Sequence, residues 1–343
     1  MIDKIVAAVL LLLIATTTGW SKPVHHYVFF AHERERIKEA SFLENKALEG
    51  AQLKYSWGEL EPEKDRYDFT EIKKDLAFLT SKGKKLFIQL QEVSFSPQWK
   101  LVPKYLLTDE YNGGVAPQYE NDVDEQNPKI AGWVARRWDP MVQERFHKLL
   151  NALGKEFNGR IEGINLPETS LVFGESGKLF PKGFTPEIYR DALVTNMRAL
   201  KSAFPKSVAL QYANFMPGEW LPGNDKSYLK TIYKAAQDLK VGVGGPDLLP
   251  FRLWQNNHSY PLIRASSGLI PTAVAVQDGN YGDIDKKTGK RASIAELVAF
   301  ATAQLTVDYI FWCTEEPYYS KELMPFLLGP KASPPAALRT KRP

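Results

Sequence analysis

Eight short runs rich in apolar, β-branched and aromatic residues recur along the chain, and stretches with helical spacing separate them. The runs are 25–31, 50–55, 86–90, 162–166, 207–213, 241–244, 272–276 and 309–312. Strands that alternate with helices form parallel sheets, because each crossover helix returns the chain to the same edge. Eight strands joined by seven crossovers predict an α/β fold, a (β/α)8 TIM barrel, with a doubly wound open sheet as the competing arrangement.

Three helices have clear start or stop signals. The pairs 139–140 (Asp-Pro) and 185–186 (Thr-Pro) each supply an N-cap side chain and a first-turn proline. A helix that begins at Thr70 is expected to stop at Gly83, because glycine commonly ends helices. Further helical stretches are expected at 33–45, 225–239, 259–267, 293–305 and 321–328.

The alternation is interrupted once, over residues 94–138, directly after the third strand. This stretch contains several glycines and prolines, three tryptophans and an acidic patch at 120–125. A long connection of this kind inside a domain is usually functional or evidence against the assigned elements. We interpret it as a long loop on the substrate side of the barrel.

The two ends of the chain differ from the middle. Lys4 precedes an apolar run at 5–15 and small or hydroxylated residues at 16–19, a pattern typical of a secretory signal. The run is shorter than the ~20 residues that span a membrane. We therefore expect a signal peptide at 1–21, one barrel domain at 22–330 and a disordered tail at 331–343. The protein is expected to be exported to a bacterial periplasm or secreted, and to be a membrane-anchored structural protein only if the signal stays uncleaved.

Charge and motif content exclude several functional classes. The net charge of +4 is spread along the chain without a basic stripe, which argues against a nucleic-acid partner. The five histidines form no metal-binding pattern, and no nucleotide loop or serine-hydrolase elbow is present, so we expect no metal and no cofactor. The one cysteine, Cys313, permits no intrachain disulfide and is interpreted as a buried, inert thiol.

The fourth run leads into the sequence EGINLPETS at 162–170. Strand alternation places Gly163 and Asn165 on one side, and Pro167 ends the strand because it has no N–H to donate. Glu168 then emerges at the carboxyl end of a buried strand, where α/β barrels hold their catalytic groups. In the alternative interpretation, Glu168 only caps a loop and pairs with a surface lysine.

The residues that follow the other strands form a common rim of carboxylates, amides and aromatic rings. Amides and acids bind sugar hydroxyls, and aromatic faces pack on the C–H face of a pyranose. The expected substrate-binding residues are Trp57, Gln91, Asn165, Tyr212, Gln277, Asn280 and Trp312. Asn214 and Asp247 belong to the same rim. Taken singly, Trp57 and Trp312 could be core residues and Asn214 and Asn280 turn residues.

Glycosidic cleavage requires two carboxyl groups. Glu168 is our candidate acid, and Asp278, after the seventh strand, is the leading candidate for its partner. Glu315 and Glu316, after the eighth strand, compete with it, and Glu92 is a third choice. Asp278 could instead belong to an Asp-Gly turn.

The segment WGELEPEKDRYDF at 57–69, followed by a helix and KKLFIQLQ at 84–91, resembles the second and third strands of clan A glycoside hydrolases, which include barrel β-galactosidases and xylanases. The resemblance implies a barrel with its acid/base carboxylate at Glu168 and an eighth-strand tryptophan at Trp312. Two features depart from it: residues 166–167 separate Asn165 from Glu168, and the seventh strand offers Asp278 where that clan has a glutamate nucleophile.

The sequence therefore predicts an exported glycoside hydrolase that cleaves a poly- or oligosaccharide, with Glu168 as general acid/base. The two departures from the clan's pattern are also compatible with an inverting enzyme. They equally allow the alternative, a catalytically inactive carbohydrate-binding barrel that serves in envelope polysaccharide handling.

Overall fold

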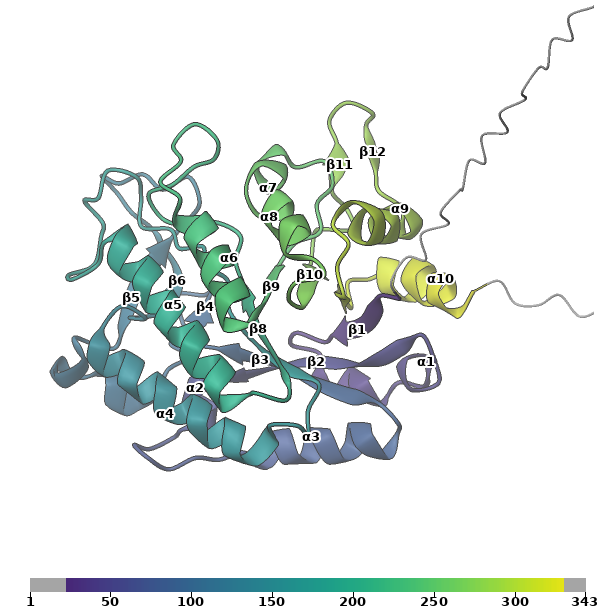
Figure 1. Cartoon of the computed structure of the whole chain (residues 1–343), viewed down its shortest axis with the longest axis horizontal. Coiled ribbons are helices and arrows are strands. Elements are labelled where there is room, and N and C mark those ends of the chain that lie inside the picture. The colour runs from purple at the N-terminus through teal and green to yellow at the C-terminus, as the bar shows by residue number, and fades with distance from the viewer. Residues whose placement is uncertain (1–22, 330–343) are drawn as a thin grey trace, which may run out of the picture.

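Eight parallel strands close into a barrel in the computed structural model, which describes residues 23–329 (Figure 1). The strands are β1 (His25–Phe29), β2 (Leu48–Ser56), β3 (Lys85–Gln91), β7 (Gly163–Leu166), β8 (Val208–Tyr212), β9 (Gly242–Gly245), β10 (Thr272–Val276) and β13 (Tyr309–Cys313). Their spatial order follows the chain, and β1 closes the barrel by pairing with both β2 and β13. The (β/α)8 prediction is confirmed, and the open-sheet alternative is wrong.

Helices cover the outside of this barrel. The main ones are α3 (Thr70–Ser81), α4 (Pro140–Phe157), α5 (Pro186–Ala203), α6 (Tyr228–Leu239), α8 (Ser259–Ser266), α9 (Ile294–Ala299) and α10 (Met324–Leu328). The others are η1 (Arg34–Lys38), α1 (Ala40–Leu43), α2 (Trp57–Leu60), α7 (Leu253–Asn257), η4 (Phe300–Gln304) and η5 (Tyr319–Leu323). Among residues 23–329, no helix has the length and apolar character needed to cross a bilayer.

The caps and apolar faces explain where the main helices lie. Asp139 accepts hydrogen bonds from the first-turn N–H groups of α4, and Thr185 does the same at α5, as predicted. In α6 the buried residues Leu229, Ile232 and Ala236 recur at helical spacing, so one face packs inward. The helix expected at 33–45 is wrong as a single element, because extended backbone at Glu39 divides it into η1 and α1.

The stretch after β3 contains a small sheet that the sequence did not indicate. Antiparallel strands β4 (Val93–Ser94), β5 (Val115–Tyr119) and β6 (Ile130–Ala135) form it in the order β4-β6-β5. The short helices η2 (Lys104–Leu107) and η3 (Asp109–Tyr111) precede β5. Pro117 is tolerated because β5 is an edge strand. Residues 93–138, called the excursion below, therefore form a small sheet with two short helices rather than a loop throughout.

Inside the barrel, aromatic rings pack against one another, and a glycine leaves the space that one of these rings occupies. The ring of Phe87 packs edge-on against Tyr27, Tyr309 and Phe311. Gly163 faces the same ring, and a Cβ at this position would lie 2.5 Å from it. One layer further along, Gln52 donates to Asn165 Oδ1 at 2.8 Å. Gly163 and Asn165 thus face the interior, as strand alternation predicts.

The expected signal peptide at 1–21 and tail at 331–343 lie outside the described residues. Export and cleavage of the signal therefore stay predictions.

Candidate functional site

A pocket of about 500 Å³ opens at the carboxyl ends of the barrel strands. Its lining comes from six of these ends: Lys54 from β2, Gln89 and Gln91 from β3, Tyr212 from β8, Gln277 after β10, Pro246 after β9, and Pro167 and Glu168 after β7. His32 and residues of the excursion, among them Phe95 and Trp99, complete it. Four residues predicted from the sequence are therefore brought together: Gln91, Glu168, Tyr212 and Gln277.

Glu168 is half-buried in this pocket. Its Oε2 accepts a hydrogen bond of 2.6 Å from Nδ2 of Asn214, which follows β8. No basic side chain within residues 23–329 forms an ion pair with it, so the alternative of a loop cap paired to a surface lysine does not describe its surroundings.

Burial raises the pKa of Glu168 to about 7, although the hydrogen bond from Asn214 lowers it. The negative charge of Asp247 also raises this pKa, and the positive charge of Arg137 lowers it. Near neutral pH a substantial fraction of Glu168 is therefore protonated, which is the state a general acid requires.

A buried network fixes the backbone on which Glu168 stands. Arg137 forms a 2.6 Å ion pair with Glu92, and both side chains are only 4% exposed. The same guanidinium donates to the carbonyl oxygen of Glu168 at 2.8 Å and to the hydroxyl of Tyr189 at 2.7 Å. Tyr189 in turn donates to the carbonyl oxygen of Thr169 at 3.1 Å. Glu92, a predicted third-choice catalytic group, thus lies behind the site as the counter-ion of Arg137.

Asp247, after β9, is a second carboxyl group close enough to Glu168 to influence its pKa. Its Oδ1 accepts from Nδ2 of Asn280 at 3.0 Å, and its Oδ2 from Nε2 of Gln255 at 3.4 Å. Burial raises the pKa of Asp247 itself. From the sequence, Asp247 was predicted to belong to the rim because it follows a strand closely, but no role was predicted for it. Asn280 was predicted as a sugar ligand, but its side-chain amide donates to this carboxylate.

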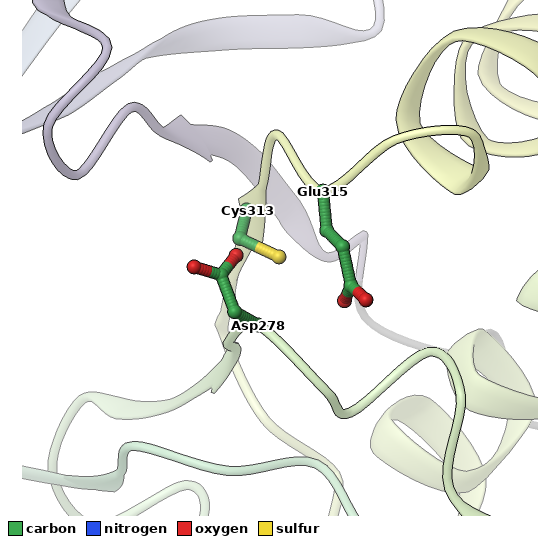
Figure 2. Close-up of side chains that lie close together, drawn as sticks. All are labelled: Asp278, Cys313 and Glu315. Carbon is green, nitrogen blue, oxygen red and sulfur yellow. The ribbon is translucent and has the colours of Figure 1, made fainter.

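The remaining predicted carboxylates lie at the ends of β10 and β13 (Figure 2). Asp278 and Glu315 flank the buried Cys313, and one donor atom from each of the three lies within 4.8 Å of the others. Burial raises the pKa of the Cys313 thiol, in keeping with an inert sulfhydryl. Glu315 also accepts from the backbone N–H of Gly279 at 2.8 Å. Glu316 is exposed and pairs with Arg36 at 3.0 Å.

Two predicted aromatic ligands are core residues instead of pocket residues. Trp57 is fully buried, packs against Phe146 and donates to Glu61 at 2.8 Å. Trp312 is fully buried and donates to Nδ1 of His26 at 3.0 Å. Both fit the core interpretation that the sequence left open. Asn165 lies one layer below the pocket. There Nε2 of Gln52 donates hydrogen bonds to Oδ1 of Asn165 and to the hydroxyl of Tyr212.

Several residues that line the pocket were not predicted as site residues, and Lys54 and Trp99 are two of them. Lys54 lies two positions after the inward-facing Gln52 in β2, so strand alternation could have identified it. Trp99 belongs to the excursion, where no regular sequence pattern predicts which way a side chain points.

Comparison with known proteins identifies the fold. No family model and no curated protein matches the chain. Among solved structures, the catalytic domain of the β-amylase from Paenibacillus polymyxa matches with a TM-score of 0.55 and 8% identity, over 84% of this chain and 92% of that one. The β-galactosidase from the Antarctic haloarchaeon Halorubrum lacusprofundi matches with a TM-score of 0.52 and 14% identity, over 84% of this chain.

The second match covers 52% of the β-galactosidase, so this chain spans about half the length of that enzyme. At these identities the likeness establishes a shared barrel and assigns no activity. The resemblance to barrel glycoside hydrolases is confirmed at the level of the fold.

Proposed function

We propose that the protein is an exported glycoside hydrolase that cleaves a poly- or oligosaccharide, with Glu168 as its general acid. The observation that carries this proposal is the place of Glu168, a half-buried carboxyl group in a pocket at the carboxyl end of the barrel. Export rests on the apolar run at 5–15 of the sequence.

The surroundings of Glu168 suit proton donation. A leaving-group oxygen must be protonated as the glycosidic bond breaks, and an acid with a pKa near the working pH does this best. A pKa of about 7 leaves about half of Glu168 protonated at neutral pH and most of it protonated in mildly acidic solution. The Arg137 hydrogen bond to its backbone and the Asn214 hydrogen bond to its carboxyl group hold it in position.

Asp278 is the proposed second carboxyl group, acting as nucleophile or as base toward water. It directly follows Gln277, which lines the pocket, and its side chain is exposed. Asp247 is less suited to this role, because its oxygens accept from two amides and burial opposes its ionisation. When Asp247 is ionised, its charge raises the pKa of Glu168.

The rest of the pocket suits a sugar. Gln89, Gln91 and Gln277 offer amide donors and acceptors for hydroxyl groups. Phe95 and Trp99 line the same pocket although they are 73% and 62% exposed. Exposed rings beside a polar cleft can stack on the C–H face of a pyranose.

One observation favours a second candidate, a carbohydrate-binding barrel without hydrolytic activity. The pocket-lining residue after β10 is the neutral Gln277 rather than a carboxylate. If Asp278 does not reach the substrate, the pocket holds one acid only and binds glycan without cleaving it.

A hydrolysis screen separates the two candidates. Wild-type protein, Glu168→Gln and the control Glu144→Gln, which changes an exposed acid on α4, are incubated with a panel of neutral and acidic polysaccharides. We expect wild type and Glu144→Gln to release reducing ends from at least one of them, and Glu168→Gln to lose at least a hundredfold in rate. Binding without release by the wild type would support the second candidate.

A further inference from the structure

Lys54 places an ammonium group in the pocket. It lies in β2 two residues after Gln52, so both side chains face the barrel interior. The side chain is half-buried, and its Nζ lies 5.0 Å from the centroid of the Phe29 ring. The proposed function makes no use of this cation.

Two lysines at the opposite end of the barrel, where β3 begins, show how other cations of this protein find partners. The buried Lys84 donates to the carbonyl oxygens of Asn45 and Leu48, at 2.7 and 2.6 Å. Lys85 forms an ion pair of 3.0 Å with Glu162. Within residues 23–329, by contrast, the ammonium of Lys54 forms no ion pair within 4.0 Å.

The groups that face Lys54 leave its charge largely uncompensated. Asp278 is the carboxylate that acts on it electrostatically, but Asp278 is exposed and clusters with Cys313 and Glu315. Burial accordingly lowers the pKa of Lys54, and the charge of Asp278 only partly opposes this. The other ionisable residues of the pocket are Glu168 and His32. A protonated Glu168 adds no negative charge, so no carboxylate of the described pocket lining then opposes the ammonium of Lys54, and Asp278, outside the lining, opposes it only in part.

We propose that Lys54 forms an anion-binding subsite, and that the saccharide recognised by this pocket carries a negatively charged substituent, a carboxylate or a sulfate ester. An anion that enters the pocket meets the ammonium where solvent screens the pair less than at the surface. The amides of Gln89, Gln91 and Gln277 remain available for hydroxyl groups. This inference rests on the proposed function, because it assumes that the ligand is a sugar.

The experiment measures binding at equilibrium, so it does not depend on catalysis. Calorimetry compares three ligands of equal length: an oligogalacturonide, the same oligosaccharide with its carboxyl groups reduced to alcohols, and a sulfated oligosaccharide. The wild type should bind one of the two anionic ligands about tenfold more tightly than the neutral one, since a hydrogen bond to a charged group is worth roughly 1.5 kcal/mol or more. The anion that is preferred identifies the substituent.

Two variants and a control locate the effect. Lys54→Met should lower the affinity for the preferred anionic ligand about tenfold, to that of the neutral one, whereas Lys54→Arg should retain much of the preference. Lys46→Met, at an exposed lysine outside the pocket, should behave as the wild type. Circular dichroism and thermal melting confirm that each variant is folded.

The outcomes separate this inference from the proposed function. Equal binding of anionic and neutral ligands by the wild type overturns the inference alone, as does a preference that survives in a folded Lys54→Met. Failure to bind any saccharide overturns the proposed function and the inference together.

Discussion

Nδ2 of Asn214 lies 2.6 Å from Oε2 of Glu168, so the residues that follow β8 and β7 meet at a single carboxyl group. The amide stabilises the ionised form of Glu168, whereas burial and the charge of Asp247 favour the protonated form. The balance of these effects sets the pH at which the group can donate a proton.

The pH dependence of hydrolysis should report this balance. A general acid with a pKa of about 7 is lost as pH rises, so kcat/KM should fall above pH 7. In Asn214→Leu the stabilising hydrogen bond to the carboxylate is absent, so the fall should move to higher pH. A pH–rate profile of both proteins checks this, and a fall that stays in place would show that another group limits the rate.

Stability should depend on the same carboxyl group. Its pKa is raised in the folded state from about 4.5 to about 7, so ionisation destabilises the fold as pH rises through this window. Glu168→Gln cannot ionise and should be more stable than wild type at pH 8, by at most roughly 3 kcal/mol, since one pKa unit corresponds to about 1.4 kcal/mol. Below about pH 4 the difference should vanish. Urea denaturation at both pH values measures it, and equal stability at pH 8 would contradict the burial of the charged group.

Glu92 should prove structural. Glu92→Gln leaves the buried guanidinium of Arg137 without its counter-ion, which is expected to cost roughly 3 to 5 kcal/mol of unfolding free energy. The double variant Glu92→Leu/Arg137→Met should be less destabilised than the single variants Glu92→Leu and Arg137→Met added together, and these three proteins form a cycle with the wild type. Chemical denaturation of the four proteins gives the coupling energy. A fully stable Glu92→Gln without activity would instead assign Glu92 to catalysis.

The interior of the barrel should not accept a larger residue at Gly163. A Cβ there would lie 2.5 Å from the ring of Phe87, so Gly163→Ala is expected to cost about 1 to 3 kcal/mol. Phe87→Leu in the same chain should recover part of this loss. Gly223→Ala is the matched control, because a Cβ at that position meets no atom within 4 Å. Thermal melting of the variants compares them, and an unchanged melting temperature for Gly163→Ala would contradict the packing described.

Trp99 should contribute to binding but not to folding. Trp99→Ala removes a pocket-lining ring that is 62% exposed, so affinity for a bound saccharide should fall by about three- to tenfold while stability stays unchanged. Trp220→Ala is the control, because Trp220 is 56% exposed and stacks on Phe215 away from the pocket lining. If both variants lose affinity equally, the loss does not arise from this pocket.

The fold could be predicted because strands and helices alternate with clear periods. Strand β10 has the bounds expected from the sequence, Thr272–Val276, since a run of five mostly apolar residues between Pro271 and Gln277 favours a buried strand. The small sheet after β3 could not be predicted, because β4 has only two residues, and Pro117 in β5 and Gly132 in β6 interrupt the alternating pattern of those strands. Long-range pairing, not local preference, decides that these segments form strands.

The site residues that could be predicted are those whose position in or just after a strand decides which way their side chains point. Glu168 and Gln277 follow strands closely, so the barrel brings them to one pocket. Trp57 could not be placed in this way, since α2 begins there and turns the ring into the core. The pairing of Asp247 with Asn280 joins residues from two strand ends and has no signal in either segment alone.

The rate of hydrolysis as a function of the leaving group tests the role of Glu168 most directly. Wild type and Glu168→Gln are compared on a natural glycoside, whose alcohol leaving group must be protonated, and on an activated aryl glycoside of the same sugar, whose leaving group departs unaided. We expect the substitution to reduce the rate at least a hundredfold on the first substrate and far less on the second. An equal reduction on both substrates, or none on either, would contradict the assignment of Glu168 as general acid.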